Sequence, residues 1–220
     1  KGSNARPRRP FSGASAVAPQ VRGTLRNRIQ VRVGDGTAAE GLDDGGRGLA
    51  NIDSRLDRPA AKDALAGEPA TIRERITGTT DLADLADADV VVEAAVEEMG
   101  VKRDVFAELD AITDDDVVLA TNTSTLSVTE IASATDRAAR VVGLHFMNPV
   151  PVMDGVEVVV GERTAPAVVE FAHAFAAALE KETWEADDKP GFVTNRILMP
   201  WINEGIRAYD EGVADKADID

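Results

Sequence analysis

The chain of 220 residues contains no cysteine and only two histidines. The lack of cysteine excludes disulfide bridges and thiolate metal sites, and two histidines cannot form a histidine-rich metal cluster, so no metal site is expected. No apolar run approaches the roughly 18 residues that a membrane helix needs, and no hydrophobic signal segment is evident. We therefore expect a soluble, cytoplasmic protein with no membrane partner.

Aromatic residues make up 4% of the chain, but apolar residues together make up 44%, which is typical of a globular core. Positive charge is scarce, since 24 basic residues face 39 acidic ones and the net charge is −15. Such a charge repels phosphate backbones and argues against nucleic acid as a partner. The many carboxylates are either a plain solvated surface or the surface of a halophilic protein, whose self-repulsion concentrated salt would screen.

The beginning of the chain differs in charge from the rest. Eight basic residues against two acidic ones give residues 1–40 a net charge of +6, so the remaining 180 residues carry −21. This basic leader is also rich in Gly, Pro, Ser and Ala. It is either a nucleic-acid or membrane arm, or a segment outside the fold that is disordered or translated out of frame. No aromatic residue is interleaved with the arginines, which favours the second interpretation.

From about residue 49 onward the pattern predicts alternating helices and strands. Apolar residues at helical spacing predict helices at 49–61, 65–76, 99–112, from 127, 164–179 and 191–206. Short apolar runs predict buried strands at 90–92, 117–120, 141–146, 156–160 and 183–186. This alternation predicts an α/β fold with a doubly wound, Rossmann-type sheet.

Particular residues are expected to begin or interrupt these helices. Ser127 and Glu130 have the spacing of a capping box, and Thr164, followed by Pro166, is expected to cap the helix that runs to residue 179. Pro69 is expected to interrupt the segment 65–76.

Ligands on doubly wound sheets bind beyond the carboxyl ends of the strands. In this chain polar residues follow three predicted strands, at 93–97, 121–124 and 145–148. We therefore expect these three segments to meet at one crevice.

His145 lies near the end of an apolar strand, where a single histidine is more often structural than catalytic. Glu157 follows twelve residues later, after a turn that contains Pro149 and Pro151 and can double the chain back. A carboxylate beside an imidazole fixes its tautomer and stabilises the imidazolium that forms when the ring accepts a proton. With neutral polar groups nearby, this pair suits alcohol oxidation by proton abstraction and hydride transfer. The candidate neutral groups are Ser124, Asn148 and Asn195.

Separate motifs along the chain share the order and spacing of one enzyme family. They are Val91-Val92-Glu93-Ala94, residues 122–127 (NTSTLS), 145–153 (HFMNPVPVM), 156–159 (VEVV), 190–196 (PGFVTNR) and Glu204-Gly205. In these motifs the chain from Leu49 to Asp220 resembles the L-3-hydroxyacyl-CoA dehydrogenases, in particular the 3-hydroxybutyryl-CoA dehydrogenases. The resemblance implies an NAD-binding Rossmann domain followed by an all-α dimerisation domain. It also implies oxidation of a (3S)-3-hydroxyacyl-CoA to the 3-oxoacyl-CoA in fatty acid metabolism, with NAD as cofactor, an acyl-CoA as substrate and a homodimer as the complete protein.

The resemblance implies roles for individual residues. His145 looks like the general base on the 3-hydroxyl group, and Glu157 like its partner. Ser124, Asn148 and Asn195 match positions that contact the substrate.

The positions that match cofactor contacts of the family are Glu97, Lys102, Ser124 and Asn148. Lys102 could instead be a solvated residue on the first turn of its helix, and Glu97 a surface residue in its loop. His173 matches no catalytic position and is interpreted as a helix residue. Trp184 and Trp201 are interpreted as packing groups.

The first part of the chain departs from the family pattern. The family opens with a strand and a Gly-x-Gly-x-x-Gly turn that binds the pyrophosphate, and an acidic residue about twenty positions later binds the ribose. The candidate turn, residues 34–39 after the apolar segment 29–33, stands too close to the next family-like segment and is interpreted as coincidental. The first βαβ unit is therefore expected to be missing or replaced. Smaller departures are Asp154-Gly155, where the family usually has Lys-Leu, and Thr194, where Val is common.

These observations divide the chain into an atypical leader (1–48), a partial NAD-binding Rossmann-like domain (49–188) and the truncated start of a helical dimerisation domain (189–220). We expect a chain that is incomplete at both ends and reduces little NAD by itself. Each charge-assisted hydrogen bond lost to the pyrophosphate would weaken cofactor binding by roughly 1.5–3 kcal/mol. The alternatives are a catalytically impaired fragment and a non-catalytic family member that binds acyl-CoA or a dinucleotide.

Overall fold

The computed structural model describes residues 29–32, 52–54, 56 and 68–220. The strands are β1 (Ile29–Arg32), β2 (Ile76–Thr79), β3 (Val90–Glu93), β4 (Val118–Thr121), β5 (Val141–Phe146), β6 (Gly155–Val160) and β7 (Glu182–Asp187). The α-helices are α4 (Pro69–Glu74), α5 (Met99–Ile112), α6 (Val128–Ala132), α7 (Pro166–Ala178), α8 (Thr194–Asp210) and α9 (Lys216–Ile219). Two short 3-10 helices are η2 (Leu82–Leu85) and η3 (Ala138–Arg140).

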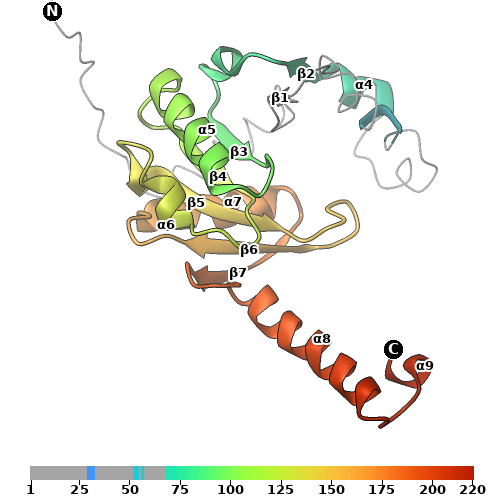
Figure 1. The fold of residues 1–220 in the computed structure, drawn as a ribbon. Coiled ribbons are helices and arrows are strands. Elements are labelled where there is room, and N and C mark those ends of the chain that lie inside the picture. Colours follow the sequence, from blue (N-terminus) through green and yellow to red (C-terminus); the bar gives the residue numbers. More distant parts are fainter. Residues whose placement is uncertain (1–28, 33–51, 55, 57–67) are drawn as a thin grey trace, which may run out of the picture.

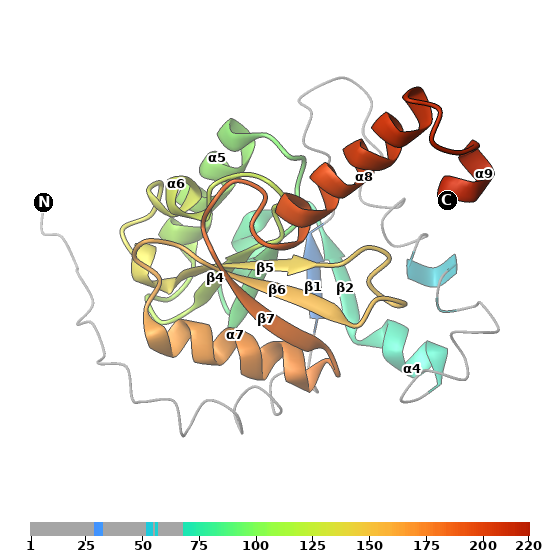
Figure 2. The same ribbon diagram turned by 90° about the horizontal axis from the view of Figure 1, so that it is seen from below.

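Five strands form one sheet in the order β3-β4-β5-β6-β7 (Figures 1 and 2). Strands β3, β4 and β5 are parallel, whereas β6 runs antiparallel to β5 and parallel to β7. The turn with two prolines after β5 reverses the chain as predicted, and His145 consequently lies opposite Glu157 in the β5–β6 register. The predicted Rossmann-type α/β sheet is confirmed, with one antiparallel strand pair in it.

Helices cover both faces of this sheet, α5 and α6 on one and α7 on the other (Figure 2). On the first face Phe106 of α5 packs in one apolar cluster with Leu119 and Val141. On the second face Phe175 of α7 belongs to a cluster with Val142. Each such buried side chain contributes about 1.5–3 kcal/mol. The strands are apolar on both faces because both are covered, which explains why continuous apolar runs predicted them.

Strand β1 lies within the segment assigned to the leader. Ile29–Arg32 pairs in parallel with β2, and these two strands form a sheet of their own (Figure 2). Residues 29–32 alternate apolar and polar side chains, the pattern of a half-buried strand. The leader therefore contributes a strand to the fold, contrary to the expectation that it stands outside. The glycine-containing turn at 34–39 lies outside the described residues.

Two predicted helix boundaries are wrong in detail. Pro69 begins α4 instead of interrupting a helix, because a proline at the first position sacrifices no hydrogen bond, and Ile76 already belongs to strand β2. Ala165 occupies the N-cap of α7 and makes no side-chain bond to the helix. The hydroxyl of Thr164 instead donates to the carbonyl of Val141 (2.7 Å) and accepts from the backbone of residue 161 (3.0 Å). Thr164 thus holds a loop against β5. The predicted helix 49–61 lies mostly outside the described residues.

Helix α8 leaves the sheet and extends away from it, and α9 follows at its far end (Figure 1). Gly191, with φ at +79°, turns the chain between β7 and α8, and a Cβ there would lie 2.9 Å from the backbone nitrogen of Arg196. Apolar side chains of α8 such as Ile197 and Trp201 are exposed (66% and 73%). Among the described helices none is long and apolar enough to cross a membrane.

Candidate active site

The carboxyl ends of β3, β4 and β5 are joined by hydrogen bonds that follow directly from their register. The backbone N–H of Asn122, after β4, donates to the carbonyl of Glu93 at the end of β3 (2.8 Å). The side-chain oxygen of Asn122 accepts from the backbone N–H of Phe146, at the end of β5 (2.9 Å). The three strand ends therefore meet at one edge, as predicted.

His145 and Glu157 form a buried pair across the β5–β6 hairpin. Nδ1 of His145 lies 3.0 Å from Oε2 of Glu157. The imidazole is 9% exposed and the carboxylate is fully buried. The pair predicted from spacing is therefore in direct contact. No hydrogen-bond partner reaches Nε2 of His145 from the described residues.

The second oxygen of Glu157, Oε1, accepts three N–H groups. They come from the indole of Trp184 on β7 (3.2 Å) and from the backbone of Val193 (2.8 Å) and Thr194 (3.1 Å), where α8 begins. Burial raises the pKa of Glu157, but the hydrogen bonds from His145 and from these three donors outweigh burial and hold the pKa below its ordinary value. Glu157 is therefore ionised at neutral pH, as a carboxylate orienting a histidine must be.

Phe192 limits the space around the imidazole. Its ring lies edge-on to that of His145, with 6.1 Å between centroids, and Phe192 itself is buried. Phe192 has a φ of +50°, so it continues the left-handed turn that Gly191 begins. The sharp turn into α8 thus places both an aromatic ring and two N–H donors against the pair.

Lys102, on the first turn of α5, is 1% exposed, which excludes the solvated alternative. Its Nζ donates to Oε1 of Glu93 (2.8 Å) and to the carbonyl of Ala95 (3.2 Å), and lies 3.4 Å from Oε2 of Glu97. Glu93 is buried too, and its other oxygen accepts from the hydroxyl of Thr121 (2.7 Å). A buried ammonium is tolerated here because both its charge and its donors are matched.

Glu97 binds the loop after β4. Its Oε1 accepts from the hydroxyl of Thr123 (2.6 Å) and from the backbone N–H groups of Ser124 (2.8 Å) and Thr125 (3.0 Å). Burial raises the pKa of Glu97, but these bonds and the charge of Lys102 outweigh it, so the pKa is lowered. Glu97 is 38% exposed, and its contacts exceed those of a plain surface residue.

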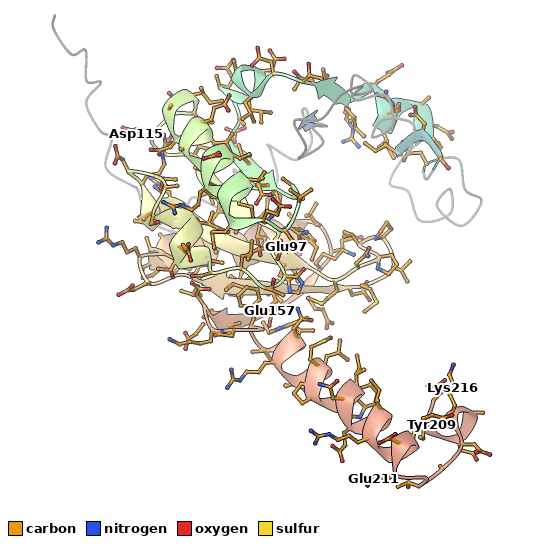
Figure 3. All side chains as sticks on the ribbon, viewed as in Figure 1. Glu97, Asp115, Glu157, Tyr209, Glu211 and Lys216 are labelled. Carbon is orange, nitrogen blue, oxygen red and sulfur yellow. The ribbon has the colours of Figure 1, made fainter. Side chains whose placement is uncertain are left out.

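Ser124 and Asn195 are brought together from distant parts of the chain. The side-chain amide of Asn195, on the first turn of α8, donates to the backbone carbonyl of Ser124 (3.0 Å). Asn148 lies exposed in the turn after β5. Figure 3 shows Glu157 where α8 leaves the sheet and Glu97 in the loop that leads to α5. The predicted residues Glu97, Ser124 and Asn148 therefore lie in the segments that follow β3, β4 and β5, and Asn195 of α8 is hydrogen-bonded to one of them.

Three residues carry more than the sequence suggested, Glu93 and Trp184 at this edge and Asp188 at the opposite end of the sheet. Glu93 could have been noticed, because a carboxylate that ends an apolar strand is apt to be buried and paired. Asp188, interpreted as a boundary residue, accepts from Ser127 and from the N–H groups of Val128 and Thr129, and these bonds lower its pKa against the effect of burial. Trp184 gave no signal in the sequence that it would reach Glu157.

The described residues contain no group of three or more histidine and carboxylate side chains that could hold a metal ion.

Two family patterns match the chain. Residues 24–189 match the 3-hydroxyacyl-CoA dehydrogenase NAD binding domain, and residues 191–220 match the 3-hydroxyacyl-CoA dehydrogenase C-terminal domain. The first match begins before residue 49 and includes strand β1.

Known relatives agree with these matches. A 3-hydroxybutyryl-CoA dehydrogenase of Clostridioides difficile is 43% identical over 173 residues, which cover 78% of this chain and 62% of that protein. The human mitochondrial hydroxyacyl-coenzyme A dehydrogenase is 44% identical over 146 residues, covering 66% of this chain and 46% of its own length. The chain spans about three fifths of the length of the 3-hydroxybutyryl-CoA dehydrogenases that it matches.

Solved structures show the same fold. The crystal structure of FadB2 from M. tuberculosis superposes with a TM-score of 0.80 at 36% identity, covering 94% of this chain and 73% of that one. The (S)-3-hydroxybutyryl-CoA dehydrogenase PaaH1 from Ralstonia eutropha gives 0.77 at 36% identity, covering 94% and 70%. The chain therefore belongs to the 3-hydroxyacyl-CoA dehydrogenase family and carries that family's NAD-binding domain, followed by the start of its C-terminal domain.

Proposed function

We propose that the protein oxidises a (3S)-3-hydroxyacyl-CoA to the 3-oxoacyl-CoA with NAD⁺, and that His145 and Glu157 act as its catalytic pair. The observation that carries this proposal is the 3.0 Å contact between Nδ1 of His145 and Oε2 of a fully buried Glu157. The names of the relatives, 3-hydroxybutyryl-CoA and hydroxyacyl-coenzyme A dehydrogenases, support the substrate class.

The pair has the arrangement of a general base. An ionised Glu157 accepts a hydrogen bond from Nδ1–H, so the neutral imidazole carries its lone pair on Nε2. Nε2 takes the proton of the 3-hydroxyl group, and the carboxylate stabilises the imidazolium that results. Removal of that proton prepares the carbon of the hydroxyl group to give up its hydride, for which NAD⁺ would be the acceptor, and the alcohol would become a ketone. General-base catalysis of this kind is worth about 10²–10⁴ in rate.

We propose that NAD binds at the edge next to this pair. A bound NAD⁺ supplies the acceptor for the hydride. Ser124 has a hydroxyl without a partner among the described residues, and Asn148 presents an exposed amide beside the strand of His145. We propose that Ser124, Asn148 and Glu97 hold the nicotinamide end of the cofactor. Lys102 spends its donors inside the protein, so we assign it to fixing Glu97.

The substrate end is assigned to Ser124, Asn148 and Asn195. Asn195 reaches this position because the start of α8 is bound to Glu157, and its amide holds the backbone of Ser124. Neutral donors suit a thioester carbonyl and a hydroxyl group, since neither carries a full charge.

We also propose that the protein forms a homodimer and is adapted to high salt. Exposed apolar side chains on α8, among them Ile197, Trp201 and Ile206, support the first proposal. The net charge of −15 supports the second. Sedimentation in dilute and concentrated KCl tests both.

The decisive experiment joins residues 49–220 to the N-terminal and C-terminal segments of the Clostridioides difficile relative. We expect this chimera to form NADH with (S)-3-hydroxybutyryl-CoA and not with the (R) isomer. A folded chimera without turnover, or equal turnover of both isomers, would contradict the proposal. Binding of acyl-CoA without turnover would favour the non-catalytic alternative.

A further inference from the structure

Trp184 does more than pack. It stands beside Glu157 in the parallel β6–β7 register, and its indole N–H donates to Oε1 of Glu157 (3.2 Å). The ring is partly buried. Within the described residues it is the one side-chain donor to that oxygen, since the other two donors are backbone N–H groups.

The ring can lie there because residue 155 has no side chain. Residues 155 and 157 point to the same face of β6, since side chains alternate along a strand. A Cβ on Gly155 would lie 2.7 Å from Cη2 and 2.8 Å from Cζ3 of Trp184, which is closer than carbon atoms approach. Gly155 and Trp184 are therefore complementary, and a side chain at residue 155 would move the indole.

We infer that Trp184 is a positioning residue for the His145–Glu157 pair, and that Gly155 provides the space that this role needs. The inference rests on the proposed function for its catalytic meaning. The indole N–H fixes Oε1, and Oε2 is thereby turned toward Nδ1 of His145. Without the indole donor Oε1 keeps only its two backbone donors, so the carboxylate is held less firmly toward Nδ1 and the imidazole proton resides there less of the time.

Other groups near β7 do not compete for this role. Thr183 and Glu185 alternate with Trp184 along the strand, so they point to the other face, where both contact His173. Variants of His173 and of Trp201, exposed on α8, are therefore matched controls.

The first test is the NMR signal of the indole N–H in the full chain. The chain has two tryptophans, so Trp201→Phe assigns the two signals. We expect the indole proton of Trp184 to exchange with solvent about tenfold more slowly in the wild type than in Gly155→Ala, because the wild-type indole is hydrogen-bonded. Gly155→Ala should shift its signal and remove the protection. Equal exchange of the Trp184 indole in the wild type and in Gly155→Ala would overturn the inference.

The second test reads the imidazole itself. The chain has two histidines, and His173→Gln assigns their ¹⁵N signals. In the wild type the neutral imidazole of His145 should carry its proton on Nδ1. Trp184→Phe keeps a ring but lacks the donor, and we expect it to transfer part of the population to the Nε2–H tautomer.

The control Trp201→Phe should leave the tautomer of His145 unchanged. If Trp184→Phe also leaves it unchanged, Trp184 is purely structural and the inference is overturned. Where Trp184→Phe does not fold, Gly155→Ala gives the same readout. Neither measurement needs turnover. A chimera that lacks activity therefore refutes the proposed function separately from the positioning of Glu157.

Discussion

The chain contains two histidine–glutamate pairs with the same spacing of twelve residues, and they differ in almost everything else. His145 contacts Glu157 at 3.0 Å, and His173 contacts Glu185 at 3.0 Å. The side chains of the first pair are 9% and 0% exposed, whereas those of the second are 31% and 60% exposed. Two pairs with the same sequence spacing and the same contact distance can therefore differ widely in their exposure to water.

The difference comes from where the pairs lie in the fold. The first pair joins two neighbouring strands within the sheet and is closed off by the turn into α8. The second joins helix α7 to β7, which is the edge strand of the sheet, so water reaches it. A charge pair in water is screened and worth little, whereas a buried pair keeps its interaction but must have all its partners.

The free ring nitrogen is the second difference. Both nitrogens of His173 are engaged, Nδ1 with the hydroxyl of Thr183 (2.7 Å) and Nε2 with Glu185. His145 uses only Nδ1 within the described residues, so Nε2 can accept a proton from a ligand. A catalytic histidine needs both an orienting carboxylate and an unoccupied nitrogen, and the comparison can be tested at both points.

The largest contrast is expected in turnover. His145→Gln in the chimera removes the proposed base, and we expect kcat to fall by about a thousandfold. His173→Gln should change kcat less than about twofold, because it lies outside the site. Steady-state NADH formation measures both. Comparable losses for the two variants would mean that neither histidine is the base.

The next contrast is in stability. Glu157→Gln leaves the carboxylate's buried partners poorly matched, and we expect the free energy of unfolding to fall by about 2–3 kcal/mol. Glu185→Gln should change it by less than about 0.5 kcal/mol. Urea unfolding of the full chain measures both values. A smaller loss for Glu157→Gln than for Glu185→Gln would reverse the proposed ranking of the pairs.

The buried pair should also give stability a pH dependence. The pKa of Glu157 in the folded chain lies below the ordinary value of 4.5. Its charge therefore stabilises the fold at pH values above about 4.5, and this contribution is lost as the pH falls through the folded pKa. The difference in unfolding free energy between wild type and Glu157→Gln should shrink from neutral pH to acid. Urea titrations at several pH values test this, and a difference that grows toward acid would contradict it.

The smallest effect concerns the exposed pair alone. A double-mutant cycle of His173→Gln and Glu185→Gln should give a coupling of about 0.5 kcal/mol or less. Concentrated KCl should reduce it further by screening. Unfolding free energies of the four proteins in dilute and concentrated salt provide the measurement. A coupling above about 2 kcal/mol would mean that the exposed pair interacts as strongly as a buried pair, contrary to this prediction.

Much of the candidate site could be predicted because it depends on local pattern. The apolar runs before Glu93, Thr121 and His145 predict parallel strands, and such strands bring their carboxyl ends to one edge. The proline turn between His145 and Glu157 predicts a reversal. The sequence alone therefore predicts that these two side chains contact each other.

Other features depend on contacts that no local pattern encodes. Lys102 has the appearance of a surface residue on a helix, and its burial is possible because Glu93, at the end of strand β3, neutralises its charge. Strand β1 became visible only through its pairing with β2, which lies more than forty residues further along the chain. Thr164 has the position of a helix cap, but its hydroxyl donates to a carbonyl of β5 instead of binding the helix.

The sequence by itself determined the class of sheet, the family and the identity of the histidine and its carboxylate partner, because periodicity, turn residues and motif spacing are properties of the chain. The tertiary structure alone decided that one of two equally spaced histidine–glutamate pairs is enclosed. It alone also placed Trp184 over Gly155 within reach of Glu157. Enclosure and three-way contacts arise from segments far apart in the sequence, and their energies depend on the water that those segments exclude.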